Sequence, residues 1–454
     1  MIETGPLRSP AEPGERRRLG ATRRLLAALV VIYAFAHLDR QIINLLIEPL
    51  KHDLRLSDTQ ISLLQGFAFA LFMAVAGLPI GRLVDTGRRT AILAAGVLVW
   101  GASTLGCSLV STFAGLLALR MGVGAGEAVL TPSGHSIIAD ATPPERLGLA
   151  MAAFGVGPYL GGGLAFMLGA VLLAGVRNLG PVHFLMFAPL KVWQLVFLAV
   201  GAPTLPMALW ALWLPEPKRL ARAHGADQSM GAGVRFYGRH FSSVGLVNLT
   251  GGFTSVALSA MSAWYPTYLI RSFHWTASAA GAGFGLILMV FGAAGVVAGG
   301  LAGDAVVSRG YASGRLMTMG VTCIAGAPFA CLASLTQTPL PGLFLLAPAI
   351  FLISMALGLL PSVQQAIAPA HLRGSLSALG TLTVNLLGLG LGPTCVALAT
   401  DNLFGAPAAV GRSLALVSPV ALLIAAGCAM VGLAPYARRI VPVKLDVSFS
   451  NLRC

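Results

Sequence analysis

Long apolar stretches recur along nearly the whole chain, and short polar stretches separate them. A helix needs about 20 apolar residues to cross the hydrocarbon core of a bilayer, so this pattern predicts about twelve membrane-spanning helices. They fall into two equal groups. The first group covers 25–50, 61–84, 90–110, 113–138, 147–174 and 191–214, and the second covers 241–271, 278–303, 315–336, 342–368, 374–400 and 413–436.

A polar, basic segment over 215–240 separates the two groups and reads as a linker. We therefore expect an all-α membrane protein with two six-helix bundles. The expected parts are an N-terminal tail (1–22), an N-terminal bundle (23–214), the linker (215–240), a C-terminal bundle (241–437) and a C-terminal tail (438–454).

The composition agrees with a membrane protein, because 56% of residues are hydrophobic and only 10% are charged. Soluble globular domains carry about 25% charged residues. A net charge of +14 can indicate nucleic-acid binding, but here the basic residues collect in alternate loops and in the tails. That distribution follows the positive-inside rule. We expect both termini and the linker to lie in the cytoplasm. We also expect the protein to be embedded in the lipid bilayer and not to bind nucleic acid.

Two pairs of full charges lie inside apolar stretches: Asp39 with Arg40, and Arg120 with Glu127. A charge at the centre of a membrane helix costs roughly 2.5–3.5 kcal/mol on insertion scales unless it is paired or wetted. Nearly all other charges fall at helix ends or in loops. The four residues are therefore the first candidates for a functional site.

Helical geometry constrains how these charges can meet. Arg120 and Glu127 are about two turns apart and share one face, where Gly124 leaves room for another helix or a water-filled cleft. Asp39 and Arg40 point about 100° apart, so they need different partners. Counting the rise per residue places both near the depth of Arg120, with Glu127 roughly 10 Å further inward.

Our hypothesis is that Asp39 is the main proton-binding carboxylate and that Glu127 is a second titrating or substrate-sensing acid. Protonation would neutralise Asp39 and weaken a pairing with Arg40 or Arg120. Either arginine could hold an anionic head group. The alternative is a static ion network that holds the first and fourth helices together.

A short repeat relates the two halves, since Gly81 to Asp85 recurs as Gly300 to Asp304 at the corresponding place. Parallel halves with a substrate site between them characterise one large class of transporters. The segment from Gly81 through Asp85 to the Arg88-Arg89 pair reads as a loop, in which glycine permits a tight turn and close helix approach. We predict a conformational latch there, with Asp304 as its counterpart. The alternative is an ordinary basic loop.

These residues resemble the signature loop of the major facilitator superfamily, although the loop is one residue shorter here between Asp85 and the arginines. The stretch from Arg120 to Glu127 is similar to the arginine-and-glycine motif of its fourth helix. Gly157-Pro158 with Gly161 resembles the motif of its fifth helix. The resemblance implies the major facilitator fold.

A narrower resemblance rests on Asp39-Arg40, on Glu127 and on the run from Asn385 to Pro393. It points to bacterial members of the spinster family, proposed proton-driven carriers of lysophospholipids or sphingoid lipids. It implies a monomer in the bacterial inner membrane. The spacings Gly157-x-x-x-Gly161 and Gly388-x-x-x-Gly392 predict close helix packing, with bending near Pro158.

The expected function is proton-coupled transport of an amphipathic lipid by alternating access. The second half supports this with apolar helices and scattered polar residues: Asn248, Ser255, Ser259, Tyr265, Tyr268, Gln364, Gln365 and Asn385. The alternatives are a carrier of drugs or small organic anions, or a membrane-embedded lipid enzyme or receptor. No phosphate-binding loop, hydrolase elbow, zinc-protease or dinucleotide motif occurs, so we expect no enzyme, cofactor or metal.

Overall fold

The computed structural model describes residues 13–177, 190–219, 230–369 and 372–440. Within these ranges twelve helices are long and apolar enough to cross a membrane, which confirms the prediction. The spans are Gly20–Leu45, Asp58–Gly77, Arg89–Cys107, Phe113–Ala141, Leu149–Gly175, Val192–Leu212, Phe241–Phe273, Ala277–Ser308, Gly314–Ala333, Pro339–Ile367, Ser375–Leu403 and Pro407–Ile440.

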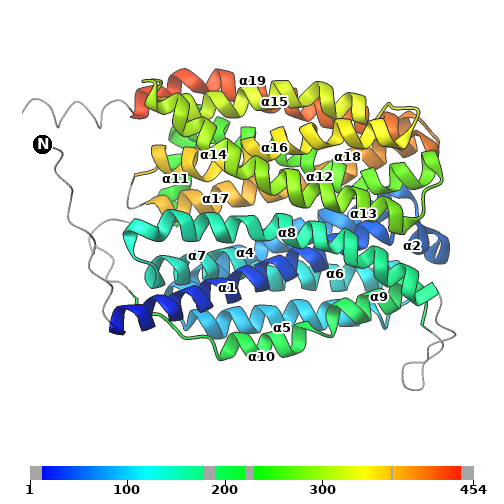
Figure 1. The fold of residues 1–454 in the computed structure, drawn as a ribbon, viewed down its shortest axis with the longest axis horizontal. Helices are drawn as coiled ribbons and strands as arrows, with labels where there is room; N and C mark the ends of the chain where they lie inside the picture. The colour runs from blue at the N-terminus through cyan, green and yellow to red at the C-terminus, as the bar shows by residue number, and fades with distance from the viewer. Residues whose placement is uncertain (1–12, 178–189, 220–229, 370–371, 441–454) are drawn as a thin grey trace, which may run out of the picture.

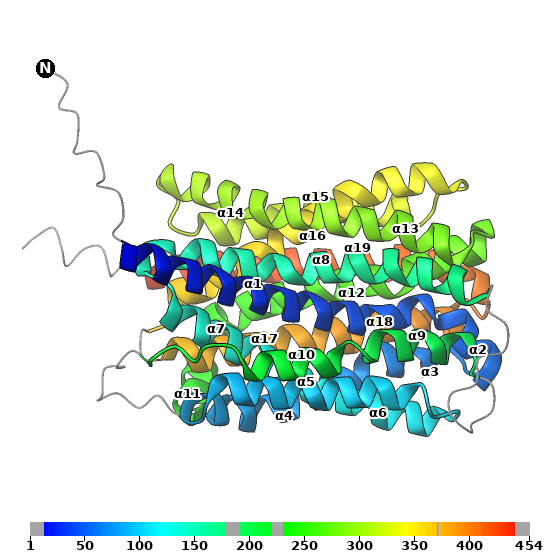
Figure 2. The ribbon, with the colours of Figure 1, turned by 60° about the horizontal axis from the view of Figure 1, so that its bottom comes forward.

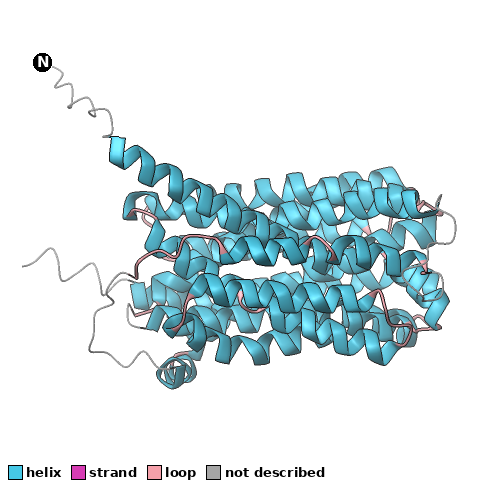
Figure 3. Ribbon diagram, turned by 90° about the horizontal axis from the view of Figure 1, so that it is seen from below, coloured by secondary structure: helices cyan, strands magenta, loops and turns pink. Residues whose placement is uncertain are grey.

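The described parts of the chain contain helices and connecting loops and no strand (Figure 3). The helices of the first half are α1 (Pro13–Ile42), α2 (Ile47–Leu54), α3 (Asp58–Ser62), α4 (Ala68–Thr86), α5 (Arg89–Cys107), α6 (Phe113–Glu127), α7 (Leu130–Ala141), α8 (Pro144–Arg177), α9 (Val192–Gly201) and α10 (Thr204–Leu212). A π-helical segment, η2 (Leu63–Phe67), joins α3 to α4, and a 3₁₀ turn, η1 (Ile43–Leu45), follows α1.

The second half repeats this all-helical arrangement. Its helices are α11 (Met230–Arg239), α12 (Leu246–Phe273), α13 (Ala277–Ile287), α14 (Ala293–Ser308), α15 (Gly314–Ala333), α16 (Pro339–Ile367), α17 (Arg373–Asn385), α18 (Gly392–Leu398) and α19 (Val410–Ile440). Short π-helical segments interrupt the spans, among them η6 (Leu386–Leu391) and η7 (Ala399–Leu403).

The two halves lie side by side with their helices running in the same general direction (Figure 1). Within the first half α1 packs along α8, and within the second α12 packs along α19 (Figure 2). The halves meet where α8 crosses α13 and where η2 approaches η6. A side chain could not fit at the first crossing, because a Cβ on Gly163 would lie 2.8 Å from the Gly285 carbonyl oxygen.

The first predicted span, 25–50, is not one continuous helix. α1 starts earlier, at Pro13, and ends at Ile42, after which η1 leads into the separate helix α2. Pro49 lies in the first turn of α2. Proline is tolerated in a first turn but breaks a helix interior, so a restart before Pro49 avoids the lost hydrogen bond. The predicted linker also contains a helix, α11.

Candidate functional site

Asp39 is fully buried on α1, and its one hydrogen-bond donor is a hydroxyl group from α5. Thr104 Oγ1 donates to Asp39 Oδ2 at 2.5 Å. The other oxygen, Oδ1, has no partner among the described residues. The expected ion pair between Asp39 and an arginine is therefore not formed in this conformation.

Arg40 forms the ion pair of the site, and its partner is Glu127 on α6. Arg40 Nε donates to Glu127 Oε2 at 3.1 Å, and Nη2 bonds the same oxygen. The guanidinium also lies 4.5 Å from the ring centroid of Phe69 and contacts Met73 Sδ. Asp39 and Arg40 thus contact different helices, which confirms the expectation from their 100° separation.

Arg120 of α6 is fully buried and donates hydrogen bonds to main-chain oxygens of two other segments, η2 and α1. Its Nε donates to Leu64 O at 3.3 Å in η2, and its Nη2 donates to Arg40 O at 3.4 Å in α1. Nη1 has no partner among the described residues. Its guanidinium carbon lies 5.9 Å from the Phe69 ring centroid, so Phe69 is close to both arginines.

Gly124 explains how Phe69 reaches this position. A Cβ on Gly124 would lie 2.5 Å from the carbonyl oxygen of Phe69 and 3.2 Å from its Cα. The space that the glycine leaves is thus filled by α4, which decides between the two alternatives of another helix and a cleft. Close packing of α4 on α6 brings the aromatic ring against the charges.

The four charges leave hydrogen-bonding capacity unused. Asp39 Oδ1 and Glu127 Oε1 are buried acceptors, and Arg120 Nη1 is a buried donor; none has a partner within the described ranges. Buried polar atoms in folded proteins are nearly always satisfied. The arrangement can therefore accept a proton, a water molecule or an anionic oxygen without first breaking every existing bond.

A chain of amide side chains continues from this site toward the second half. Asn44 Nδ2 donates to Gln41 Oε1 at 2.6 Å, and Gln65 Nε2 donates to Asn44 Oδ1 at 2.9 Å. Gln65 also approaches Ala263 O of α12 at 3.4 Å. The sequence analysis missed these residues, although three amides in apolar surroundings were a usable signal.

The second half has alanines at the positions that correspond to two of the charges. When Pro132 is aligned with Pro361, Ala349 and Ala356 correspond to Arg120 and Glu127, and both alanines are fully buried. Two of the polar contacts there stay inside the second half. Gln364 Nε2 donates to Asn248 Oδ1 at 2.7 Å, and Tyr265 donates to Ala333 O at 3.0 Å.

At one end of the molecule, Arg271 of the second half holds residues of the first. It donates to Glu48 Oε1 at 2.7 Å and to both oxygens of Asp58 at 2.7 and 2.8 Å. The Asp58 side chain is fully buried and also pairs with Lys51. We call Arg271, Glu48 and Asp58 the terminal clamp. Thr59 adds a second link by donating to Asp401 Oδ2 at 2.9 and 2.7 Å.

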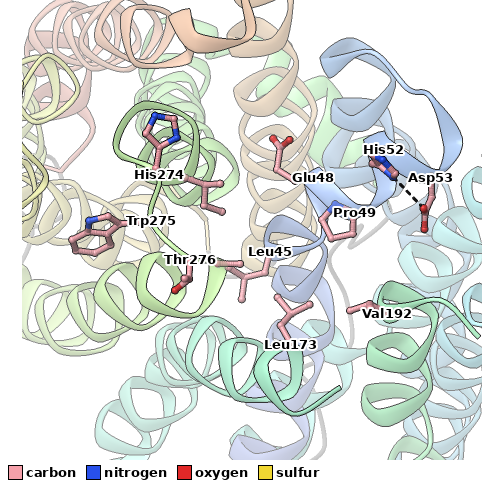
Figure 4. A pocket seen from close by; sticks show the side chains of 12 residues that line it. Leu45, Glu48, Pro49, His52, Asp53, Leu173, Val192, His274, Trp275 and Thr276 are labelled. Atoms are coloured by element: carbon pink, nitrogen blue, oxygen red, sulfur yellow. Dashed lines mark hydrogen bonds and ion pairs between the residues drawn. The ribbon is translucent and has the colours of Figure 1, made fainter. Parts of the chain in front are cut away.

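A cavity of about 490 Å³ lies at the same end, between the two halves (Figure 4). Glu48, His52 and Asp53 of α2 line one side, and His274, Trp275 and Thr276 line the other. The lining of this cavity includes none of the four buried charges. Glu48 belongs both to the lining of this cavity and to the terminal clamp.

The predicted latch region lies at the C-terminal end of α4, away from the terminal clamp. One of its two arginines, Arg89, has partners that the sequence analysis did not predict. Arg89 is fully buried, pairs with Asp140 of α7 and donates from Nε to Glu216 Oε1 at 2.7 Å. Thr90 N also donates to Glu216, at 2.9 Å. Partial burial disfavours ionisation of Glu216, but hydrogen bonds from the Thr90 amide and from Arg89 outweigh it and hold the pKa of this carboxyl below its ordinary value. Arg219 donates to the carbonyl oxygens of Val84 and Gly87 at the end of α4.

The prediction that the segment from Gly81 to Arg89 forms a loop was wrong for most of its length. The segment from Gly81 to Thr86 is the last part of α4, and only Gly87 and Arg88 connect it to α5. A Cβ on Gly81 would meet no atom within 4 Å, so Gly81 neither makes a turn nor permits close packing. Asp85 and Arg88 are exposed. Asp304 bonds Arg315 of α15 at 3.0 and 2.7 Å.

Three of the four predicted packing glycines sit at close helix crossings. A Cβ on Gly161 would lie 2.6 Å from the carbonyl carbon of Ala34, and one on Gly388 would lie 2.6 Å from Ser255 Cβ. On Gly392 it would lie 2.8 Å from the Val256 carbonyl oxygen. Gly157 makes only ordinary contact, at 3.4 Å from Tyr33. Pro158 lies inside α8.

Among the described residues no group of three or more His, Cys, Asp or Glu side chains could hold a metal ion. The site is instead a buried cluster of charges inside a twelve-span, two-half helical membrane protein. That architecture and that kind of site are typical of membrane transporters. The comparison with known sequences then identifies the family: the sequence model of the Major Facilitator Superfamily matches residues 29–393, and the chain belongs to this superfamily. Its relatives are transporters and not enzymes.

Proteins similar to this chain include an efflux pump and a sphingosine-1-phosphate transporter. An MFS-type efflux pump of Mycolicibacterium smegmatis is 28% identical over 94% of this chain and 95% of its own length. The sphingosine-1-phosphate transporter SPNS2 of Danio rerio is 26% identical over 52% of this chain and 45% of its own length.

Solved structures of similar fold include a bacterial homologue of the human lysosomal transporter spinster. Its inward-facing, occupied form matches with a TM-score of 0.74 and 24% identity, over 93% of this chain and 97% of that chain. The unoccupied form matches with a TM-score of 0.72 over 95% and 98%. These matches establish the fold.

Proposed function

We propose that this transporter couples proton movement to the passage of an amphipathic lipid with an anionic head group, of the lysophospholipid or sphingoid type. The observation that carries the proposal is the buried set Asp39, Arg40, Arg120 and Glu127 with its unfilled hydrogen-bonding capacity. In this proposal Asp39 carries the proton. Its single hydroxyl partner leaves Oδ1 free to receive it.

Glu127 acts as the second acid, because it holds the arginine that an anionic substrate needs. An incoming phosphate or carboxylate oxygen competes with Glu127 for Arg40, and Arg120 Nη1 is a further donor. Guanidinium groups bind such oxygens in bidentate geometry. Protonation of Glu127 weakens its hold on Arg40 and favours the substrate. Each step changes the charge balance between α1 and α6, which biases the two conformations differently.

The apolar second half is the surface for the acyl chain in this proposal. It has alanines where the first half has Arg120 and Glu127. The SPNS2 relative carries a lipid phosphate, which supports this substrate class.

The proposal also places the rest of the chain relative to the membrane. Both termini, the linker and the latch residues Asp85, Arg88, Arg89 and Asp304 lie on the cytoplasmic side of a bacterial inner membrane, and the chain works as a monomer. The basic loops at that end support this orientation. The bundles span 23–214 and 241–437. Gly161, Gly388 and Gly392 let neighbouring helices pack closely where they cross.

A second candidate is a proton-coupled efflux pump for drugs. The near full-length similarity to the M. smegmatis efflux pump and a partial match to a quinolone resistance transporter of Acinetobacter baumannii favour it. It uses the same acids but requires no phosphate-binding arginine.

The deciding experiment measures flux of a labelled lysophospholipid and of a fluoroquinolone in proteoliposomes under an imposed pH gradient. The variants are Asp39→Asn and, as a matched loss of one carboxylate outside the buried site, Asp53→Asn. We expect gradient-driven lipid flux in the wild type and in Asp53→Asn, and its loss in Asp39→Asn. Full gradient-driven flux in Asp39→Asn removes the proton role. Fluoroquinolone flux without lipid flux replaces the substrate assignment with the efflux reading.

A further inference from the structure

α11 lies across the end of the helix bundle and not along it. In Figure 1 it runs transverse to the spanning helices, and Figure 2 shows it at the same end of the molecule as α17, which it contacts. A helix with this direction lies parallel to the plane of the membrane that the spans cross.

One face of α11 is anchored to the second half. Gly233 is buried against α17, where a Cβ would lie 2.7 Å from Ser375 Cβ. Phe236 packs under Arg439 of α19, whose guanidinium carbon lies 5.0 Å from the ring centroid. His240 packs against Phe236 with ring centroids 4.4 Å apart. The helix is therefore held in a fixed orientation.

The opposite face is exposed and has two chemically different edges. Val234 lies on one edge and is 51% exposed, and Phe241, the first residue of the π-helical segment η3 (Phe241–Gly245) just beyond α11, is 49% exposed. Arg235 and Arg239, about one turn apart, share the other edge and are both exposed. Arg438 of α19 is exposed directly beside Arg439, which contacts this helix.

An amphipathic helix in the membrane plane, apolar on one edge and basic on the other, is the arrangement that binds at the bilayer interface. Its apolar edge enters the boundary of the acyl chains, and its arginines meet the phosphate groups. We propose that α11, with Arg438 and Arg439 at the end of α19, is a binding surface for acidic phospholipid head groups of the adjoining leaflet. This surface is separate from the buried charges and does not depend on what is transported.

Charge complementarity decides for acidic lipid over zwitterionic lipid. Basic residues clustered near a membrane surface are attracted by anionic lipids, and the attraction falls within a Debye length. Binding should therefore prefer phosphatidylglycerol to phosphatidylcholine, and added salt should reduce the preference.

The test measures lipids retained by the purified full-length protein, using native mass spectrometry after exchange into mixed phosphatidylglycerol and phosphatidylcholine. The variant is Arg235→Gln with Arg239→Gln. The matched control is Arg82→Gln with Arg309→Gln, which removes the same charge from exposed positions in the last part of α4 and directly after α14. A Lys-for-Arg version of the α11 pair keeps the charge.

We expect the Gln pair to lose the phosphatidylglycerol preference several-fold, and the control and Lys versions to keep it. Val234→Asp should also lower it, because it opposes entry of the apolar edge. An unchanged preference in the Gln pair overturns the proposal. An equal loss in the Arg82 and Arg309 control overturns it too, since net charge alone would then explain retention. Full competition by inorganic phosphate would indicate a simple anion site in place of a lipid surface and would also refute it.

Discussion

Gly66 is the position where one added methyl group should change the conformation without disrupting either half. It lies in η2 of the first half and faces η6 of the second. A Cβ there would lie 2.9 Å from the carbonyl carbon of Leu389 and 3.3 Å from Pro393 Cγ, and it would overlap the Leu389 carbonyl oxygen. Gly66→Ala therefore strains a contact that exists only while the halves touch at this level.

The geometry sets the size of the effect. Carbon atoms in contact lie about 3.5–4.0 Å apart, so the 2.9 Å approach alone requires the halves to separate here by at least about 0.6–1.1 Å, and the closer carbonyl oxygen adds to this. Overpacking of this kind costs about 1–3 kcal/mol. A penalty confined to one conformation shifts the equilibrium between conformations by about 5- to 150-fold. The shift should favour a state in which the terminal clamp is open.

Spin labels on the two halves can report this shift. His52 and Asn402 are exposed at the end that carries the terminal clamp, one in each half. With the six native cysteines replaced, labels at His52→Cys and Asn402→Cys give a distance distribution by pulsed electron paramagnetic resonance. We expect Gly66→Ala to add a population at longer distance.

Gly161→Ala is the matched control, because its Cβ would lie 2.6 Å from the Ala34 carbonyl carbon inside the first half. It should lower the thermal stability but leave the label distance unchanged. The reasoning fails if folded Gly66→Ala keeps the wild-type distribution, or if Gly161→Ala opens the clamp to the same extent.

Two further predictions concern the ion pairs at opposite ends of the molecule. Arg271→Gln removes the charge-assisted bonds to Glu48 and Asp58, so the same label pair should show an opened clamp. Arg271→Lys should open the clamp less, because the charge remains although the bidentate geometry is lost. Equal distance distributions for the wild type and Arg271→Gln would contradict this prediction. Glu216→Gln should lower the free energy of unfolding by about 1 kcal/mol at neutral pH, since the carboxylate is partly exposed and screened. The pKa of Glu216 is lower in the folded state, so its contribution is complete above the ordinary carboxyl pKa and is lost as pH falls through the folded-state value. Chemical unfolding of both proteins across acidic pH should show the difference shrinking, and a constant difference would refute the linkage.

The amino-acid sequence by itself determined the twelve spans and the presence of charges inside two of them. Both are local properties, because a membrane helix satisfies its own backbone and requires only a sufficient apolar length. The same locality makes Gly161, Gly388 and Gly392 recognisable by spacing alone. It also placed Asp39 and Arg40 on different sides of one helix.

Tertiary structure alone decided which groups meet. Arg40 pairs with Glu127, whereas Asp39 accepts a hydrogen bond from Thr104. No sequence spacing distinguishes this from the reverse pairing, because the choice depends on helix rotation and tilt. Arg89 illustrates the same limit, since its partner Glu216 comes from beyond α10. The terminal clamp was equally invisible, because Arg271 and Asp58 become neighbours only when two halves close on each other. Pairing between distant segments is set by how whole helices pack, and local pattern carries no record of it.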